Sequence, residues 1–123
     1  MGSWGTSPWD NDGAADWFGD LFDATGFAEH LRDALEGDAV EDLEEIRAAA
    51  SLLILLGRTY VYPIDCLDEH LALAVTKLRQ LAEPYRELGD EESAARVECE
   101  IALLEARLDR HRREPPPHWE DMW

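Results

Sequence analysis

Apolar residues recur at intervals of three and four along most of the chain, and β-branched residues are sparse. This spacing puts the apolar side chains on one face of a helix, so it predicts helices and not strands. We expect about five helices, with apolar faces at 12–22, 27–35, 40–56, 67–88 and 94–111. The predicted fold class is therefore all-α, in a single domain.

Polar residues and glycines mark where these helices begin and end. Asn11 or Asp12 is expected to cap the first helix, Asp38 the third and Asp65 the fourth, because their side chains accept hydrogen bonds from free backbone N–H groups. Glycine ends a helix readily because it adopts a left-handed conformation. The expected stops of the first three helices are Gly26, Gly37 and Gly57.

The last two helices carry matching apolar seams that predict an antiparallel hairpin. Gly89 and Asp90 supply the turn between them. Pro84 lies inside the first seam, and a proline there removes a hydrogen bond and clashes one turn back, so we expect a kink or break near residues 81–83. The seams consist of Leu67, Leu71, Ala74, Leu78, Leu81, Tyr85 and Leu88, and of Ala94, Val97, Ile101, Leu104, Leu108 and His111.

The third helix ends in an apolar run. Residues 52–56 are apolar on every side of the helix, which is typical of a central segment surrounded by others. Residues 58–64 are expected to form an extended connection in which Tyr60 and Tyr62 cover the core. An aromatic cluster is expected to hold the N-terminal segment on the bundle. It consists of Trp4, Trp9, Trp17 and Phe18.

Three consecutive prolines, 115–117, end the last helix and stiffen the segment that follows. We therefore divide the chain into a helical domain, 1–114, and an extended proline and tryptophan tail, 115–123. Trp119 and Trp123 either fold back onto the same molecule or offer an aromatic peptide to another one, and folding back is favoured because an exposed tryptophan is costly.

A length of 123 residues suits one domain, and the net charge of −17 restricts its partners. Such a charge repels phosphates, so the chain is expected to bind neither nucleic acid nor anionic membranes. The longest apolar run has five residues, far short of the roughly 20 that span a bilayer. No secretion signal is visible, so a cytoplasmic location is expected by default.

The negative charge is concentrated in the first third of the chain. Residues 1–45 contain thirteen acidic residues and one base, Arg32. A basic protein should therefore meet this region first. The predicted partner-binding residues are Asp10, Asp12, Asp16, Glu41, Asp42, Glu44 and Glu45.

The opening of the chain is its most distinctive stretch. Trp4-Gly5 is followed by the run 10–17, Asp-Asn-Asp-Gly-Ala-Ala-Asp-Trp. This resembles the opening of small bacterial proteins grouped as the domain of unknown function 4259 family, which begin Met-Gly-x-Trp-Gly and continue Asp-Asn-Asp-x-Ala-x-Asp-Trp. The resemblance extends weakly to Ala48–Ala50 and Gly57-Arg58. It implies a shared fold and no known activity.

The Asp-Asn-Asp run, 10–12, has two interpretations. Its oxygens are hard ligands that suit a divalent cation or another ligand. The calcium-loop pattern fails, however, because Ala14 and Ala15 stand where an oxygen donor and a glycine are needed. The interpretation that we favour is structural, with this run capping the first helix and hydrogen-bonding the Trp4-Gly5 turn.

Sequence signatures of enzymes and cofactors are missing. Cys66 and His70 lie four apart, which is half of a zinc site, but the hairpin puts Cys99 about 20 Å away at 1.5 Å per helical residue. We expect two free, mostly buried thiols, no metal and no cofactor. His30 is expected near the core, and the basic run 107–113 near the acidic N-terminal helices.

Together these features predict a non-enzymatic acidic module that binds a basic protein, as an immunity or inhibitor protein does. Two alternatives remain open. One is a structural or regulatory module that forms a homodimer through the apolar third helix. The other is a protein with a ligand or metal site at Asp10, Asp12 and Asp16.

Overall fold

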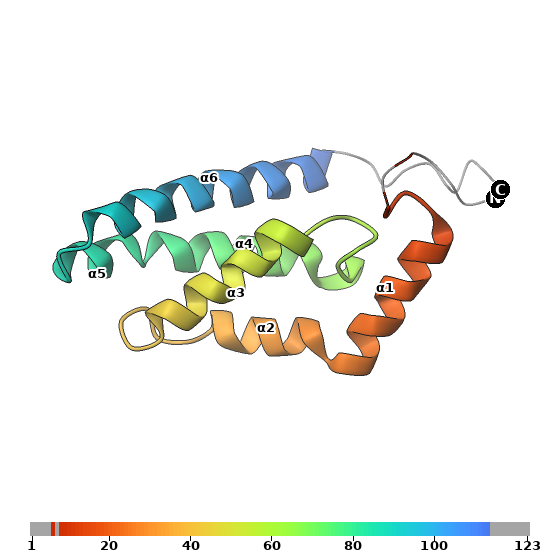
Figure 1. Cartoon of the computed structure of the whole chain (residues 1–123), viewed down its shortest axis with the longest axis horizontal. Helices are drawn as coiled ribbons and strands as arrows, with labels where there is room; N and C mark the ends of the chain where they lie inside the picture. Colours follow the sequence, from red (N-terminus) through yellow and green to blue (C-terminus); the bar gives the residue numbers. More distant parts are fainter. Residues whose placement is uncertain (1–5, 7, 114–123) are drawn as a thin grey trace.

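The computed structural model describes residue 6 and residues 8–113, and within them the chain is all-α, as the apolar spacing predicts. None of these helices has the length and apolar character that crossing a bilayer requires. The predicted tail, 115–123, lies outside the described residues. Figure 1 shows the elements in order: α1 (Asp12–Thr25), α2 (Phe27–Leu35), α3 (Leu43–Leu56), α4 (Ile64–Arg79), α5 (Ala82–Glu87) and α6 (Glu91–Arg113).

Helix α1 begins and ends at the predicted residues. The Asn11 side chain accepts a hydrogen bond from the Ala14 backbone N–H at 2.8 Å, so Asn11, and not Asp12, is the cap. Gly26 adopts a left-handed conformation with φ of 60°, which a side chain would strain. This glycine turns the chain directly from α1 into α2, so the two helices meet at a sharp corner (Figure 1).

Helix α4 lies at the centre of the fold, because α2, α3 and α6 all pack against it. Its buried residues include the predicted seam positions from Leu67 to Leu78, and His70 and Val75 are buried beside them. The core continues through Ile46, Ala50 and Leu53 of α3 and through Leu31 and Leu35 of α2. Helix α1 contributes chiefly Phe22 and otherwise projects from the bundle (Figure 1).

The predicted hairpin and its break are confirmed. Helix α4 ends at Arg79, and the short α5 follows with Pro84 in its first turn, where no helical hydrogen bond is lost. Helix α6 then runs back along α5 and α4, as the ion pairs Arg86–Glu98, Arg79–Glu105 and Arg112–Asp68 show. The last position of the first seam, Leu88, is exposed, because the chain already turns there.

Two predicted caps are wrong. Helix α3 begins at Leu43 and not near residue 40, because Asp38 caps a separate turn that precedes the helix. Helix α4 begins at Ile64, directly after Pro63, so Asp65 lies inside its first turn. In both places the polar residue lies close to the helix start, but the chain adopts a turn there that the apolar spacing does not reveal.

The prediction that residues 52–56 are surrounded is also wrong. Leu53 is fully buried, but Leu52 and Leu55 are 37% and 66% exposed. A run that is apolar on every side cannot show which side its neighbours cover.

The connection at 58–64 is compact and not extended, since Val61 and Tyr62 donate backbone hydrogen bonds to the Arg58 carbonyl. Tyr62 is buried in the core as expected, and Tyr60 is half-buried.

Candidate interaction surfaces

The seven residues between α2 and α3, with the first turn of α3, form a rigid acidic loop, residues 36–45, which we call the acidic turn. The Asp38 carboxylate accepts hydrogen bonds from the N–H groups of Val40 at 2.8 Å and Glu41 at 3.0 Å. These bonds hold the pKa of Asp38 below its usual value. The Asp42 carboxylate accepts a further bond from the Asp38 N–H at 2.9 Å.

A lysine fixes the acidic turn to the centre of the fold. The Lys77 ammonium donates a hydrogen bond of 2.7 Å to the Gly37 carbonyl, so α4 holds the start of the turn. Val40 at its tip is 70% exposed. The turn is therefore a projection that hydrogen bonds within the chain hold in place.

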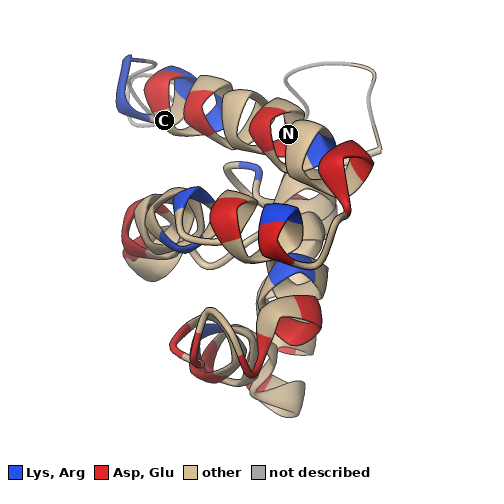
Figure 2. Cartoon of the chain, turned by 90° about the vertical axis from the view of Figure 1, so that its left-hand side faces the viewer, with Lys and Arg blue, Asp and Glu red and all other residues tan. Residues whose placement is uncertain are grey.

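The acidic turn presents carboxylates that no lysine or arginine among the described residues neutralises. Glu41, Glu44 and Glu45 are exposed, and none of them forms an ion pair within the described residues. Asp42 is half-buried and is occupied by its bond to Asp38. Figure 2 shows the result: red dominates the lower part, where α2 and this turn lie, whereas red and blue alternate along α6 at the top.

The remaining predicted partner-binding residues lie elsewhere. Asp10 and Asp12 are half-buried at the start of α1, and Asp16 is exposed one turn later. Figure 1 places the start of α1 and the start of α3 toward opposite ends of the molecule. The structure therefore does not bring the two predicted acidic sets together.

The predicted aromatic cluster at the N-terminal segment holds only in part. Trp17 is 61% exposed and packs edge-on against the half-buried Phe18. Trp9 is half-buried, and its ring lies 4.6 Å from the Arg58 guanidinium. Trp4 and the turn expected around it lie outside the described residues.

The basic run at the end of α6 was expected to lie near the acidic N-terminal helices, but two of its arginines, Arg112 and Arg113, pair with other carboxylates. Arg112 makes a bidentate ion pair with Asp68 of α4, with distances of 2.7 and 3.0 Å. Arg113 pairs with Asp109 on its own helix. These pairs hold the pKa values of both carboxylates below their usual range. Arg107 and Arg58 differ, because neither pairs with a carboxylate in the described part of the chain.

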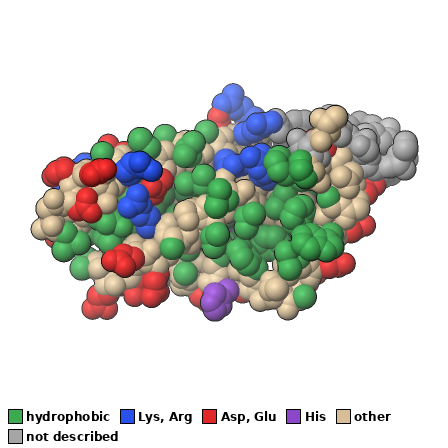
Figure 3. Space-filling model, viewed as in Figure 1, with side chains coloured by type: hydrophobic (Ala, Val, Ile, Leu, Met, Phe, Trp, Pro, Cys, Tyr) green, Lys and Arg blue, Asp and Glu red, His purple; other side chains and the backbone are tan. Residues whose placement is uncertain are grey.

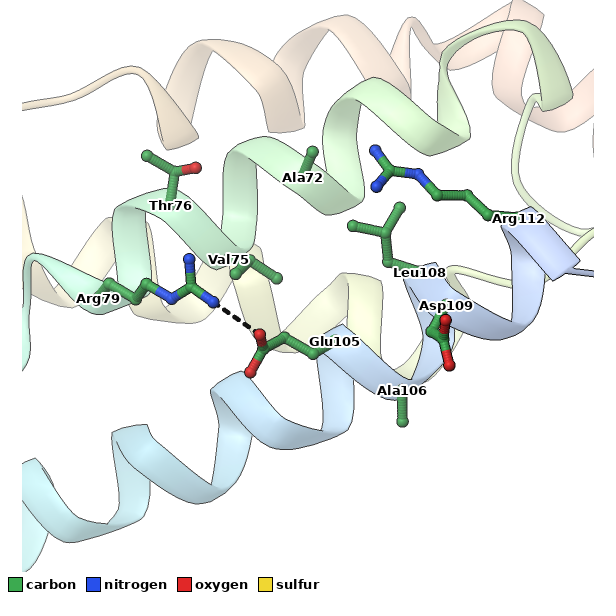
Figure 4. Close-up of a pocket in the computed structure, with 9 residues that line it drawn as sticks. All are labelled: Ala72, Val75, Thr76, Arg79, Glu105, Ala106, Leu108, Asp109 and Arg112. Atoms are coloured by element: carbon green, nitrogen blue, oxygen red, sulfur yellow. Dashed lines mark hydrogen bonds and ion pairs between the residues drawn. The ribbon is translucent and has the colours of Figure 1, made fainter.

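A groove of about 680 Å³ runs between α4 and α6. Its floor is apolar and is formed by Ala72, Val75 and Leu108 (Figure 4). Arg79 and Glu105 face each other across it at 2.6 Å. Each charged residue that lines the groove pairs with another lining residue or with a neighbouring side chain, as Arg79 does with Glu105 and Arg112 with Asp68.

A buried polar pair lies inside the bundle, and the sequence analysis missed it. The Tyr62 hydroxyl lies 2.6 Å from Nδ1 of His70. Burial lowers the pKa of His70 and raises that of Tyr62, so both side chains are neutral and share one hydrogen bond. His30, the histidine expected near the core, is exposed. The available signals were that His70 stands next to Leu71 of the apolar seam and that Tyr62 was already expected to cover the core.

The cysteines are free, as expected, but only one is sheltered. Cys66 is half-buried, and burial raises the pKa of its thiol to about 11, whereas Cys99 is exposed. Cys66 and His70 gain no further ligands: across residue 6 and residues 8–113 there is no group of three histidine, cysteine or acidic side chains arranged to hold a metal.

Comparison with known proteins gives one match. Residues 2–123 match a family described as "Domain of unknown function (DUF4259)". No curated protein and no solved structure matches the sequence.

Proposed function

The chain belongs to the DUF4259 family, and from that premise and its own geometry we propose that it is a non-enzymatic protein-binding module. Its acidic turn binds a basic partner protein, in the manner of an immunity or inhibitor protein that covers a cationic site. Asp10, Asp12 and Asp16 form a second, separate acidic surface. The proposed setting is the bacterial cytoplasm.

The observation that carries this proposal is the fixed geometry of the unpaired carboxylates. Glu41, Glu44 and Glu45 project from a turn that Asp38 and Lys77 already hold in place. Binding through a preformed surface does not have to order a loop first, so more of the interaction energy appears as affinity. The exposed Val40 adds an apolar contact that a merely soluble acidic surface does not need.

Complementary charge would give the rapid association that this function requires. A dense negative surface attracts a cationic protein before contact and raises the association rate. The attraction falls with salt because the Debye length decreases from about 10 Å at 0.1 M to about 3 Å at 1 M. Rapid association is what a protein that must cover a harmful cationic site needs.

The test uses Glu41→Gln/Glu44→Gln/Glu45→Gln, which removes three charges and leaves the Asp38 and Asp42 bonds intact. The matched control is Glu83→Gln/Glu87→Gln/Glu92→Gln, which removes three exposed charges from α5 and α6. Each protein is immobilised and used to capture partners from the native lysate at 0.05 and 0.5 M salt. Association and dissociation of the captured protein are then measured with purified components.

We expect the first variant to slow association of a basic protein about tenfold at low salt, and the control to leave it nearly unchanged. Thermal melting of both variants checks that they remain folded. Unchanged capture by the first variant, together with a raised melting temperature, would show that the carboxylates are only a solvated surface whose repulsion has been relieved.

The exposed residues of α3 favour the homodimeric module as a second candidate. Leu52 and Leu55 form an apolar face that a second copy of the chain is able to cover. Sedimentation of the wild-type chain and of Leu55→Ser across a hundredfold concentration range distinguishes the candidates. A dimer that dissociates in Leu55→Ser supports the homodimer, and a monomer throughout contradicts it.

A further inference from the structure

Two neighbouring arginines differ from most of the others in this acidic protein. Six arginines pair with carboxylates in the described part of the chain: Arg32, Arg47, Arg79, Arg86, Arg112 and Arg113. Arg58 and Arg107 are both half-buried and have no such partner there. Trp9 covers one face of the Arg58 guanidinium but brings no negative charge.

The two cations lie close enough to repel each other. Burial lowers the pKa of Arg107, and the charges of Arg58 and Arg110 lower it further. In a chain with 28 acidic residues, a half-buried pair of like charges without a counter-ion is costly unless an anion neutralises it. The site is therefore suited to a carboxylate-bearing ligand.

An apolar face adjoins this arginine pair. The contacts Arg47–Glu100 and Thr59–His111 show that α3 and the following turn run alongside α6 in the same direction. Leu52 and Leu55 of α3 and Leu103 of α6 are exposed along this stretch. Figure 3 shows hydrophobic side chains gathered over these elements and over α1, with basic side chains directly above them.

We propose that this surface binds residues 114–123 of the same chain. That segment lies outside the described residues, but its sequence complements the surface. It contains three acids, Glu114, Glu120 and Asp121, and no lysine or arginine. Its apolar residues are Trp119, Met122 and Trp123 together with three prolines. Carboxylates meet Arg58 and Arg107, and the tryptophans cover the leucines.

The length of the segment permits this contact within one molecule. Arg107 lies six residues before the end of α6, or about 9 Å at 1.5 Å per residue. Glu120 lies seven residues beyond the same end, which corresponds to about 23 Å of extended chain. Glu120 and Asp121 therefore reach Arg107 even though the prolines delay the return of the chain. This proposal is independent of the acidic turn, which lies on another part of the molecule.

The test measures hydrogen exchange of the backbone amides of residues 118–123 in the full-length chain. We expect exchange to be at least tenfold slower than in a synthetic peptide of residues 114–123, and to quicken several-fold between 0.05 and 1 M salt. Arg107→Glu should remove this protection. The matched control, Arg96→Glu, makes the same charge change at an exposed position of α6 and should preserve it.

A charge exchange and a reciprocal measurement complete the test. Adding Glu120→Arg and Asp121→Arg to Arg107→Glu should restore at least part of the protection. If Arg107→Glu does not fold, the variant Trp119→Ser/Glu120→Gln/Asp121→Asn leaves the helical domain unaltered. Phenylglyoxal should then modify Arg107 several-fold faster than in the wild type, with no change at Arg96.

Three results would overturn the proposal. The first is exchange as fast as in the free peptide, and the second is an equal effect of Arg107→Glu and Arg96→Glu. The third is protection that appears only as protein concentration rises, because the surface would then bind the segment of a second copy.

Discussion

Tyr62 and His70 show how a buried polar pair is tolerated in an otherwise apolar core. The two side chains are 2% and 3% exposed and satisfy each other at 2.6 Å. Their rings also pack edge to face, and Phe22 packs against Tyr62 in the same way. Because Tyr62 comes from the turn before α4, the pair fixes that turn to the helix.

Tyr62 and His70 should therefore contribute to stability as a coupled pair. Tyr62→Phe leaves Nδ1 of His70 buried without a hydrogen-bond partner and should lower the free energy of unfolding by about 1–3 kcal/mol. The double variant Tyr62→Phe/His70→Leu should cost less than the sum of the two single variants. Urea unfolding of all four proteins measures the difference. Strict additivity would mean that the two groups do not interact.

The same pair gives a pH dependence with a defined sign. Burial holds the pKa of His70 below its usual value, so the unfolded chain binds its proton first as the pH falls. The stability supplied by neutral His70 should thus be present above about pH 6.5 and decline as the pH drops below that value. Urea unfolding at pH 7.5 and 5.5 should show a smaller loss for His70→Gln than for wild type. His30→Gln, which alters an exposed histidine, should behave like the wild type.

At the scale of elements, the start of α1 depends on one side chain. Asn11 accepts the capping hydrogen bond, whereas Asp12 acts only through its charge in the first turn. Asn11→Ala should lower the free energy of unfolding by about 0.5–2 kcal/mol, and Asp12→Ala by less. Chemical unfolding of both variants tests this order, and the reverse order would show that Asp12 is the cap.

Helices α3, α5 and α6 are joined by a single arginine. Arg47 makes a bidentate pair with Glu100 at 2.9 and 2.7 Å, and its guanidinium lies 5.4 Å from the Tyr85 ring. Arg47→Ala should lower the free energy of unfolding by about 2–3 kcal/mol, because the pair is largely sheltered from water. Arg32→Ala, which breaks the exposed Arg32–Glu36 pair, should leave it almost unchanged in the same denaturation experiment.

Most elements of this fold are predictable from the sequence, but most of the surfaces are not. The apolar spacing finds the helices, and Asn11, Gly26 and Pro84 identify their ends or breaks, because these signals are local. The exposure of Leu52 and Leu55 depends on which neighbours pack against α3, and that information is not local. The Arg47–Glu100 pair likewise joins residues 53 positions apart, which no helical spacing indicates.

At the scale of the whole molecule, charge is neutralised unevenly. Ion pairs between α4, α5 and α6 absorb much of the acidity of the C-terminal half, as at Glu98, Glu105 and Asp68. Within residues 8–113, Glu41, Glu44 and Glu45 of the acidic turn have no such compensation. The acidic set predicted from composition is consequently divided by the fold into a turn at one end and a helix start at the other (Figure 1).

This imbalance should make the folded chain sensitive to salt. Raising the salt concentration from 0.05 to 0.5 M screens the repulsion among unpaired carboxylates and should raise the melting temperature by about 2–5 °C. Glu41→Gln/Glu44→Gln/Glu45→Gln should melt higher at low salt and respond less. A calorimetric scan of each protein at both salt concentrations measures this effect. An equal rise in melting temperature in the wild type and the variant would show that the repulsion arises outside these three carboxylates.

The exposed thiol on α6 gives the molecule a built-in site for a fluorescent reporter. Cys99 lies eight residues before Arg107, a little over two helical turns or about 12 Å along the axis of α6. At neutral pH a maleimide dye should attach there in preference to Cys66, which is half-buried and has a pKa of about 11. The dye would then sense whatever covers the surface beside the arginine pair, in a chain that carries no substitution.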